Sequence, residues 1–355
     1  MRLRSLPLGV FLVITSIAPA ALVLSLAASP SLVWTQQSPE ARSASVVRQS
    51  PAGRIEVLAS LPVLPGYEPR ASLAPDASAI IACALDEARD RERGATLWRI
   101  ALPGGKASAL ERGVALTPPI ALSRARAAFL KVVARVPASP ERRQAGEYDA
   151  VVTEIRLLLE GGNSVPLMAD ESYGLFLAGA IGDSLVVYRV SKDEAAFYLL
   201  PATPGASWRR LAAAPHGPFA RDFSVRRGRL YFASLIPGQV GAGVFSLDLS
   251  TGETREVVRV QSDHPTPLAF GGDLVFARPV ASGEELAAWD GSAVRGLART
   301  GGGAFPLAGD ASGRYLAFGR TGASQELWLL DREKPTPVRL STETYFTVFG
   351  FGELP

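Results

Sequence analysis

Cysteine and histidine are almost missing from this sequence of 355 residues. Its one cysteine, Cys83, has no second cysteine to pair with, so a disulfide-stabilised scaffold is excluded. The two histidines, His216 and His264, are too few for a histidine-rich metal site. A strong net charge is missing too. The 37 basic and 34 acidic residues leave a net charge of +3, so we expect no electrostatic field that attracts nucleic acid.

Motifs for catalysis are also absent. The sequence contains no G-x-S-x-G nucleophile elbow, no phosphate-binding loop and no dinucleotide-binding glycine fingerprint. The sequence therefore names no reaction. It predicts a protein that is not an enzyme, with no catalytic residue, no cofactor and no metal.

Hydrophobic residues, by contrast, make up 47% of the chain, which is ample for a packed core and excludes a disordered chain. The 34 glycines and 27 prolines follow no period, which suits a chain with many turns. Beyond residue 53 we find no amphipathic helix. Short apolar runs are separated by Gly, Pro, Asp and Ser, which is the pattern of strands and turns.

The N-terminal segment has the pattern of a membrane anchor or a signal peptide. Arg2 and Arg4 precede residues 8–34, which carry no charge and exceed the roughly 20 residues that span a bilayer. The tripeptides APA at 18–20 and SLA at 25–27 resemble signal-peptidase sites. An uncleaved anchor and a cleaved signal peptide therefore both stay open. A buried core helix is the third reading.

Both membrane-related readings place the rest of the chain outside the cytoplasm, because basic flanking residues stay inside. The predicted location is the periplasm or the cell surface, with the protein either anchored in the inner membrane or secreted. We assign residues 1–35 to the hydrophobic helix and the polar, non-periodic residues 36–53 to a linker. No cysteine lies near this segment, which excludes a lipoprotein anchor. Cys83 lies in an apolar run, and a buried thiol suits an oxidising compartment.

The remaining chain is built from a repeat. A strongly apolar run of five to nine residues recurs six times, with centres roughly 40–56 residues apart, which is the spacing of propeller blades. The six runs are residues 80–85, 127–135, 184–190, 229–236, 273–280 and 314–320. After each run come a strand, a turn with Gly or Pro and another strand. These second elements are residues 97–105, 155–162, 197–205, 244–252, 286–291 and 327–335.

The hairpin at residues 245–253 is the clearest of the second elements. Asp248 can cap its turn through the side chain, and Gly252 can take a positive φ. Six repeats in about 300 residues leave about 50 residues each, which is room for four short strands and their loops. We therefore predict that residues 54–355 form an all-β, six-bladed β-propeller of four-stranded antiparallel blades, preceded by the N-terminal hydrophobic helix.

Burial of sheet faces in a closed ring explains physically why such a repeat is stable. A single four-stranded sheet buries its faces poorly, whereas radially stacked sheets bury both faces and leave no exposed end. Strand-like segments at 54–59 and 344–349 can each pair with a blade at the opposite terminus. Two alternatives stay open: an open sandwich, and a seven-bladed ring that uses both terminal strands.

One repeat carries a resemblance to a known family. DASGRYLAF at 310–318, ELWLLD at 326–331 and VRLS at 338–341 resemble the WD40-like repeat of TolB-type propellers. A weaker second copy is APDASAIIA at 74–82 with LWRI at 97–100.

This resemblance covers about residues 54–355 and implies the propeller fold and an extracytoplasmic compartment. Two blades depart from it, because RGR at 227–229 and GGD at 271–273 replace the family's Pro-Asp-Gly turn. The N-terminal α/β domain that accompanies the TolB propeller is missing. The resemblance therefore implies no TolB-like role in the envelope.

Five residues are candidates for a site near the central channel. In a propeller, the connection from one blade to the next lies on the same face as the loop between the second and third strands. His216 falls in one such connection, Asp263 and His264 fall in the next, and Asp170 and Glu171 fall in an earlier one. These side chains could form a ligand or cation site on one face. Solvated loop residues are the alternative reading.

Two long charged loops are expected on that same face. The loop at 86–94 extends the first repeat, and the loop at 137–149 extends the second. The candidate binding residues in them are Asp86, Glu87, Arg89, Arg91, Arg93, Arg142 and Arg143. Consecutive blades are neighbours, so the loops are expected side by side, either as a partner-binding edge or as two self-neutralising solvated loops.

These patterns predict a monomeric, extracytoplasmic propeller that binds a protein or an envelope polymer and no nucleic acid. It contacts the membrane through residues 8–34 if these are not cleaved. One alternative is a propeller-type enzyme, such as a lactonase or a glycan-acting enzyme, which needs acidic or histidine ligands converging on the channel. The other is a structural or sensory ectodomain. The sequence identifies no ligand, partner or pathway.

Overall fold

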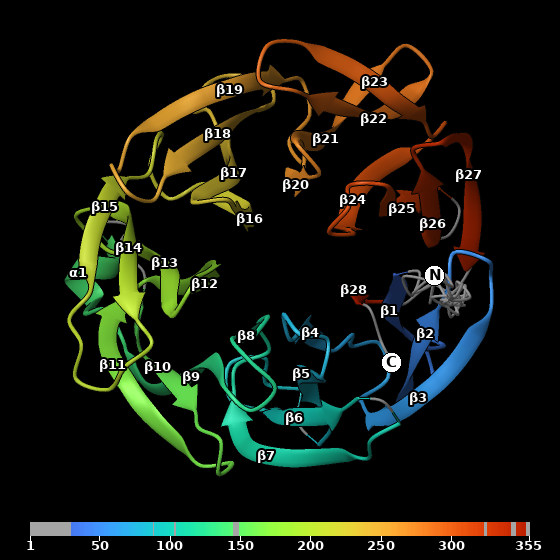
Figure 1. Cartoon of the computed structure of the whole chain (residues 1–355). Helices are drawn as coiled ribbons and strands as arrows, with labels where there is room; N and C mark the ends of the chain where they lie inside the picture. The colour runs from blue at the N-terminus through green and yellow to red at the C-terminus, as the bar shows by residue number, and fades with distance from the viewer. Residues whose placement is uncertain are drawn as a thin grey trace, which may run out of the picture.

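Short β-strands make up most of the chain that the computed structural model describes, namely residues 30–87, 89–102, 104–144, 149–322, 325–341 and 346–352. These residues form 28 strands and one short helix. The strands pair into seven four-stranded sheets, one of which joins β28 to β1, β2 and β3. Figure 1 shows the sheets as blades around a central opening, and we number the blades in chain order.

The strands of each blade are given from the innermost to the outermost. Blade 1 contains β28 (Val348–Gly352), β1 (Ser31–Gln36), β2 (Ser43–Gln49) and β3 (Ile55–Pro62). Blade 2 contains β4 (Arg70–Leu73), β5 (Ala79–Leu85), β6 (Ala95–Ala101) and β7 (Ala107–Val114). Blade 3 contains β8 (Ile120–Ala121), β9 (Ala127–Val136), β10 (Ala150–Leu158) and β11 (Ser164–Ser172).

Four further blades complete the ring. Blade 4 contains β12 (Gly174–Ile181), β13 (Ser184–Val190), β14 (Ala195–Pro201) and β15 (Arg209–Ala213). Blade 5 contains β16 (Ala220–Arg226), β17 (Arg229–Leu235), β18 (Ala242–Asp248) and β19 (Thr254–Val260). Blade 6 contains β20 (Leu268–Phe270), β21 (Asp273–Val280), β22 (Gly283–Trp289) and β23 (Val294–Arg299). Blade 7 contains β24 (Gly303–Gly309), β25 (Tyr315–Thr321), β26 (Gln325–Asp331) and β27 (Lys334–Ser341).

The sequence repeat corresponds to the blades. The six apolar runs are the second strands of blades 2 to 7, namely β5, β9, β13, β17, β21 and β25. Most of their apolar side chains are buried between sheets, which explains their composition. An all-β propeller of four-stranded antiparallel blades is thus confirmed. The predicted number of six blades is wrong, because the ring has seven.

Blade 1 escaped the repeat search because it is assembled from segments at opposite ends of the described chain. β28 pairs antiparallel with β1, so that Ser31 lies opposite Gly352 and Trp34 opposite Val348. A search for repeated sequence segments cannot find such a blade, because its innermost strand, β28, is separated in the sequence from β1, β2 and β3 by all six other blades. Both terminal strands contribute to it, as the seven-bladed alternative required.

The predicted boundaries before the propeller need correction. Residues 36–53 are not a linker, because Ser43–Gln49 form β2. The uncharged stretch 8–34 does not precede the propeller as a whole, because Trp34 is a buried core side chain of β1. Residues 1–29, the main part of the predicted hydrophobic helix, lie outside the described residues. Within the part that is described, no helix is long and apolar enough to cross a membrane.

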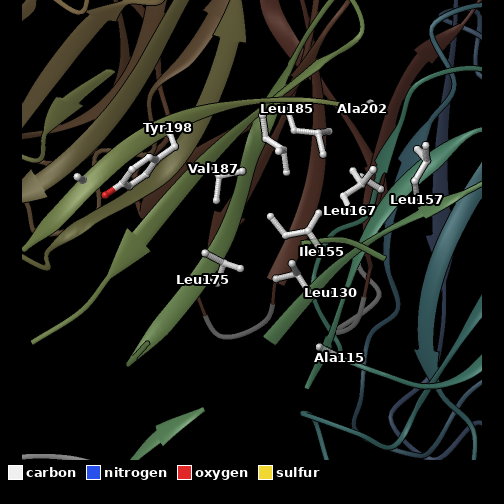
Figure 2. Close-up of a cluster of buried hydrophobic side chains, with 13 residues drawn as sticks. Ala115, Leu130, Ile155, Leu157, Leu167, Leu175, Leu185, Val187, Tyr198 and Ala202 are labelled. Carbon is white, nitrogen blue, oxygen red and sulfur yellow. The ribbon is translucent and has the colours of Figure 1, made fainter. Parts of the chain in front are cut away.

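The hydrophobic core lies between neighbouring blades. Figure 2 shows one cluster, in which Leu130 and Ile155 of blade 3 pack with Leu175 and Val187 of blade 4. Cys83 is completely buried in the cluster between blades 2 and 3, as expected from its apolar run. Burial raises the pKa of its thiol to about 12. The thiol is therefore a core group and no nucleophile.

Antiparallel blades send their connections alternately to two faces of the ring. The turns after the first and third strands lie on one face, the turn face. There Asp248 accepts hydrogen bonds from the backbone N–H groups of Ser250 and Thr251, and Gly252 has a φ of +78°, as predicted. The loops after the second strand and the connections to the next blade lie on the opposite face, the loop face. The helix α1 (Pro140–Gln144) belongs to a loop on that face.

Candidate functional site on the loop face

The two charged loops predicted to be neighbours are loops of blades 2 and 3, and both leave the ring on the loop face. A salt bridge joins their bases, because Arg135 Nη2 at the end of β9 lies 2.7 Å from Glu92 Oε2. In the first loop, the Arg91 guanidinium lies over the ring of Tyr67, 5.2 Å from its centroid. The two loops therefore lie side by side at their bases.

Much of the charge in these loops is neutralised locally. Glu87 pairs with Arg112 at 3.3 Å, and Arg143 pairs with Asp149 at 3.0 Å. The other predicted residues are Asp86, which accepts a hydrogen bond from Thr96, the exposed Arg89 and Arg93, and Arg142, whose side chain lies outside the described residues. The pairing matches the self-neutralising reading of the loops more closely than that of a strongly charged binding edge.

Asp170 and Glu171 do not lie in a connection, which corrects the prediction. They belong to β11, which continues to Ser172 and leaves only Tyr173 between blades 3 and 4. Asp170 Oδ2 accepts a hydrogen bond of 2.8 Å from Arg189 Nε on β13, so its charge is compensated. The sequence prediction failed because polar residues at the end of an outermost strand resemble a loop.

His216, Asp263 and His264 do lie in connections on the loop face, and all three side chains are exposed. His216 connects blades 4 and 5, whereas Asp263 and His264 connect blades 5 and 6. They do not assemble into one cation site with the acidic residues of blade 3. Across the described ranges, no group of three or more His, Cys, Asp or Glu side chains is placed to hold a metal ion.

A charged pair that the sequence reasoning did not select lies between these connections, at the start of β16. Arg221 and Asp222 occupy a bulge of this innermost strand, and Asp222 has a φ of +55°. Nε and Nη2 of Arg221 and Oδ2 of Asp222 are buried and have no hydrogen-bond partner among the described residues. Arg221 Nε lies 4.0 Å from Asp222 Oδ2, too far for a hydrogen bond.

The electrostatics of this pair link it to the predicted residue His264. Burial raises the pKa of the Asp222 carboxyl, and the charges of Arg221 and His264 oppose that rise. His216 and Thr266, in the two flanking connections, also have positive φ values of +64° and +48°. Three of the five non-glycine residues with positive φ in the described chain thus lie at the loop-face ends of blades 4 to 6. Such strain is often found at binding sites.

Exposed aromatic side chains adjoin the charged pair. Phe219, which precedes β16, is 41% exposed, and Phe176 on the neighbouring innermost strand β12 is 44% exposed. Phe176 stacks on Tyr188 at 5.8 Å, and Tyr188 contacts Phe223 of β16 at 5.5 Å. Figure 1 shows β12 and β16 side by side at the central opening.

We call Phe176, Phe219, Arg221 and Asp222 the β16 platform. The only sequence signal for it was an adjacent pair of opposite charges at the start of an innermost strand. Such a pair looks like an ordinary solvated loop end until the sheet places it beside the channel.

Comparisons with known proteins define the fold and no more. No known family profile and no curated protein matches the chain. Among solved structures, it is similar to TolB from Acinetobacter baumannii, with a TM-score of 0.54 and 11% identity over 92% of this chain and 67% of that one. It is also similar to a prolyl endopeptidase, with a TM-score of 0.58 and 16% identity over 90% of this chain and 50% of that one.

A third similar structure is an oligogalacturonate lyase in complex with manganese, with a TM-score of 0.58 and 12% identity over 84% of this chain and 90% of that one. At these identities the similarity shows the fold alone. The chain has a TolB-like β-propeller fold, as its repeat indicated. It spans half the length of the prolyl endopeptidase that it matches.

Proposed function

We propose that this chain is a non-enzymatic, extracytoplasmic propeller that binds another protein on its loop face, through the β16 platform. One observation carries the proposal: exposed aromatic side chains adjoin the Arg221–Asp222 pair, whose side chains are 29% and 28% exposed. Protein-binding hot spots combine aromatic side chains with arginine in this way. The charged loops of blades 2 and 3 are the outer edge of the same face.

The energetics of the platform favour a partner. Phe176 and Phe219 are 44% and 41% exposed, so burial of the remaining surface of each stabilises a complex by about 0.6–1.3 kcal/mol. A hydrogen bond to a charged group contributes about 1.5–3 kcal/mol. Arg221 and Asp222 are too far apart to hydrogen-bond to each other, and the exposed parts of their side chains are open to a partner. A polypeptide can supply both a carbonyl oxygen and an N–H group, so it suits the pair.

The extracytoplasmic location is proposed from the N-terminal sequence. Residues 8–30 precede β1 and carry no charge, so their length still reaches the roughly 20 residues that a membrane span needs. Arg2 and Arg4 on their N-terminal side orient such a segment with the propeller outside. Both an uncleaved anchor and a cleaved signal peptide are consistent with this proposal.

Site-specific photo-crosslinking in the native cell tests the proposal. We would place p-benzoylphenylalanine at Phe219 and, as the matched control, at Val338, which is 61% exposed on the outermost strand β27. We expect a discrete protein adduct from the Phe219 position that is lost in the Arg221→Ala variant. Equal adducts from both positions, or an adduct with a polysaccharide, would contradict protein binding by the platform.

An enzyme is the second candidate function, and the similarity to an oligogalacturonate lyase over 84% of the chain favours it. Its test is turnover by the purified chain of oligogalacturonates, lactones and peptides, with and without Mn²⁺. Turnover that is lost in Asp222→Asn would make the β16 platform a catalytic site. Turnover of none of these substrates, together with the crosslink, supports the binding module.

A further inference from the structure

A second feature of the loop face lies where blades 7, 1 and 2 meet. It is a cavity of about 310 Å³, at the lower end of the 300–1,000 Å³ that small-molecule pockets occupy. Glu68 and Arg70 line it from blade 2, Phe305 and Gln325 from blade 7, and Phe346 and Thr347 from the segment that leads into β28. It contains no residue of the β16 platform.

The polar end of this cavity is an ion pair that is held apart. Arg70 Nη1 lies 3.9 Å from Glu68 Oε2, which is beyond hydrogen-bond distance. The Glu68 side chain is only 21% exposed, and that of Arg70 is 47% exposed. Burial raises the pKa of Glu68, although the charge of Arg70 and a hydrogen bond from the backbone N–H of Phe346 oppose that rise. Each group therefore keeps capacity for a charged partner that enters the cavity.

The other end of the cavity is apolar and preorganised. Phe305 and Leu307 of β24 line it, together with Phe346, which is 6% exposed. Gly319 on β25 lets the Phe305 ring lie against the strand, because a Cβ atom there would collide with that ring. Thr347 Oγ1 donates a 2.8 Å hydrogen bond to the carbonyl oxygen of Pro69, which ties the segment of Phe346 to that of Glu68.

We propose that this cavity binds a free α-amino acid with an apolar side chain. The ammonium group pairs with Glu68, the carboxylate pairs with Arg70, and the side chain packs against Phe305 and Phe346. The two charges of an α-amino acid are attached to one carbon, so they lie as close together as the two charges of the cavity. A ligand with only one charge would form an ion pair with Glu68 alone or with Arg70 alone. The proposal is independent of protein binding by the platform.

Isothermal titration of the purified full-length chain with L-leucine tests the ligand chemistry. N-acetyl-L-leucine lacks the ammonium group and L-leucinamide lacks the carboxylate, and we expect each to bind at least tenfold more weakly than L-leucine. The absence of heat with L-leucine, or equal binding of all three compounds, would overturn the proposal.

Variants then place the binding in this cavity. Glu68→Gln removes the charge that burial disfavours, so this variant should fold with an unchanged or higher melting temperature and lose L-leucine binding at least tenfold. The matched control is Arg210→Gln, which breaks the ion pair of Arg210 with Glu194 on blade 4, outside the cavity, and should bind L-leucine like the parent. Parental affinity in Glu68→Gln, or equal loss in both variants, contradicts the assignment.

The platform supplies the last control. Arg221→Ala, which is expected to abolish the protein crosslink, should leave L-leucine binding unchanged. A variant that loses both would show that the two sites are not independent. The leucine titration tests only the cavity at Glu68, and the crosslink tests only the β16 platform. A negative result in one experiment therefore does not contradict the other proposal.

Discussion

Substitution of Trp34 tests whether residues 31–36 form a blade or belong to the N-terminal hydrophobic segment. Trp34 is 1% exposed and packs with Leu32 and Val47 of blade 1 and with Leu327 of blade 7. A Trp→Ala change at such a core position costs about 3–5 kcal/mol. A tryptophan in a membrane anchor outside the fold would cost nothing.

The buried indole N–H of Trp34 places the expected loss of stability at the lower end of that range. Trp34 Nε1 is buried and finds no hydrogen-bond partner in the described chain, a state that costs about 1–3 kcal/mol. Trp34→Ala removes this penalty together with the ring, so we expect a loss of about 3 kcal/mol. Trp34→Phe removes the N–H and keeps most of the apolar contact, so its loss should be clearly smaller.

Urea unfolding followed by circular dichroism measures both losses. The matched control is Val57→Ala on β3 of the same blade, because Val57 is 64% exposed and its truncation should change stability by less than about 0.5 kcal/mol. If Trp34→Ala is no more destabilising than Val57→Ala, residues 31–36 are not core and the seven-bladed ring is refuted.

Three further predictions concern the turn face and the platform. Gly313→Ala should destabilise the fold by about 2–5 kcal/mol, because Gly313 has a φ of +79° and an added Cβ would lie 2.5 Å from the Gly271 Cα. The control Gly53→Ala, at a φ of +89° with open space around it, should lose only the energy that a positive φ costs an alanine. Equal losses of melting temperature in the two variants would disprove the close contact at Gly313. The Ser250 hydroxyl and the backbone N–H groups of Thr251 and Ser250 lower the pKa of Asp248 to about 2. Because this folded-state pKa lies below the unfolded value, the stabilisation by Asp248 is complete above pH about 4 and is lost as pH falls towards 2. The stability difference between parent and Asp248→Ala should therefore shrink over that interval in pH-dependent melting, and a constant difference would contradict it. Asp222→Asn should raise the melting temperature at pH 7, because burial raises the pKa of that carboxyl and disfavours its charge; a lowered melting temperature would show that the pair with Arg221 outweighs burial.

The fold was predictable wherever the pattern is local. The second strands of six blades are continuous apolar runs because both of their faces are buried, and the sequence shows them directly. Blade 1 was not predictable in this way, because Val348–Gly352 complete a sheet that starts at Ser31. Trp34 was assigned to the hydrophobic segment because an apolar core strand that directly follows uncharged residues cannot be distinguished from them by composition.

The site was less predictable than the fold. Connections on one face could be deduced from strand alternation, so His216 and His264 were placed correctly. Asp170 was misplaced, because the strand that carries it runs on to the next blade almost without a loop. The platform and the cavity at Glu68 depend on which innermost strands are neighbours. The residues of each site come from different blades and become neighbours only when the ring closes. No spacing in the sequence therefore reveals either site.

The junction of β28 with β1 also has a consequence for biogenesis. Thr35 and Thr347, whose backbones are hydrogen-bonded across this junction, are 312 positions apart in the chain. At 5–20 residues per second, a ribosome needs about 15–60 s to travel that distance. Throughout this interval β1 presents an unpaired edge to which other nascent strands can add. A translation product that stops before residue 348 therefore lacks the innermost strand of blade 1 and leaves the edge of β1 unpaired.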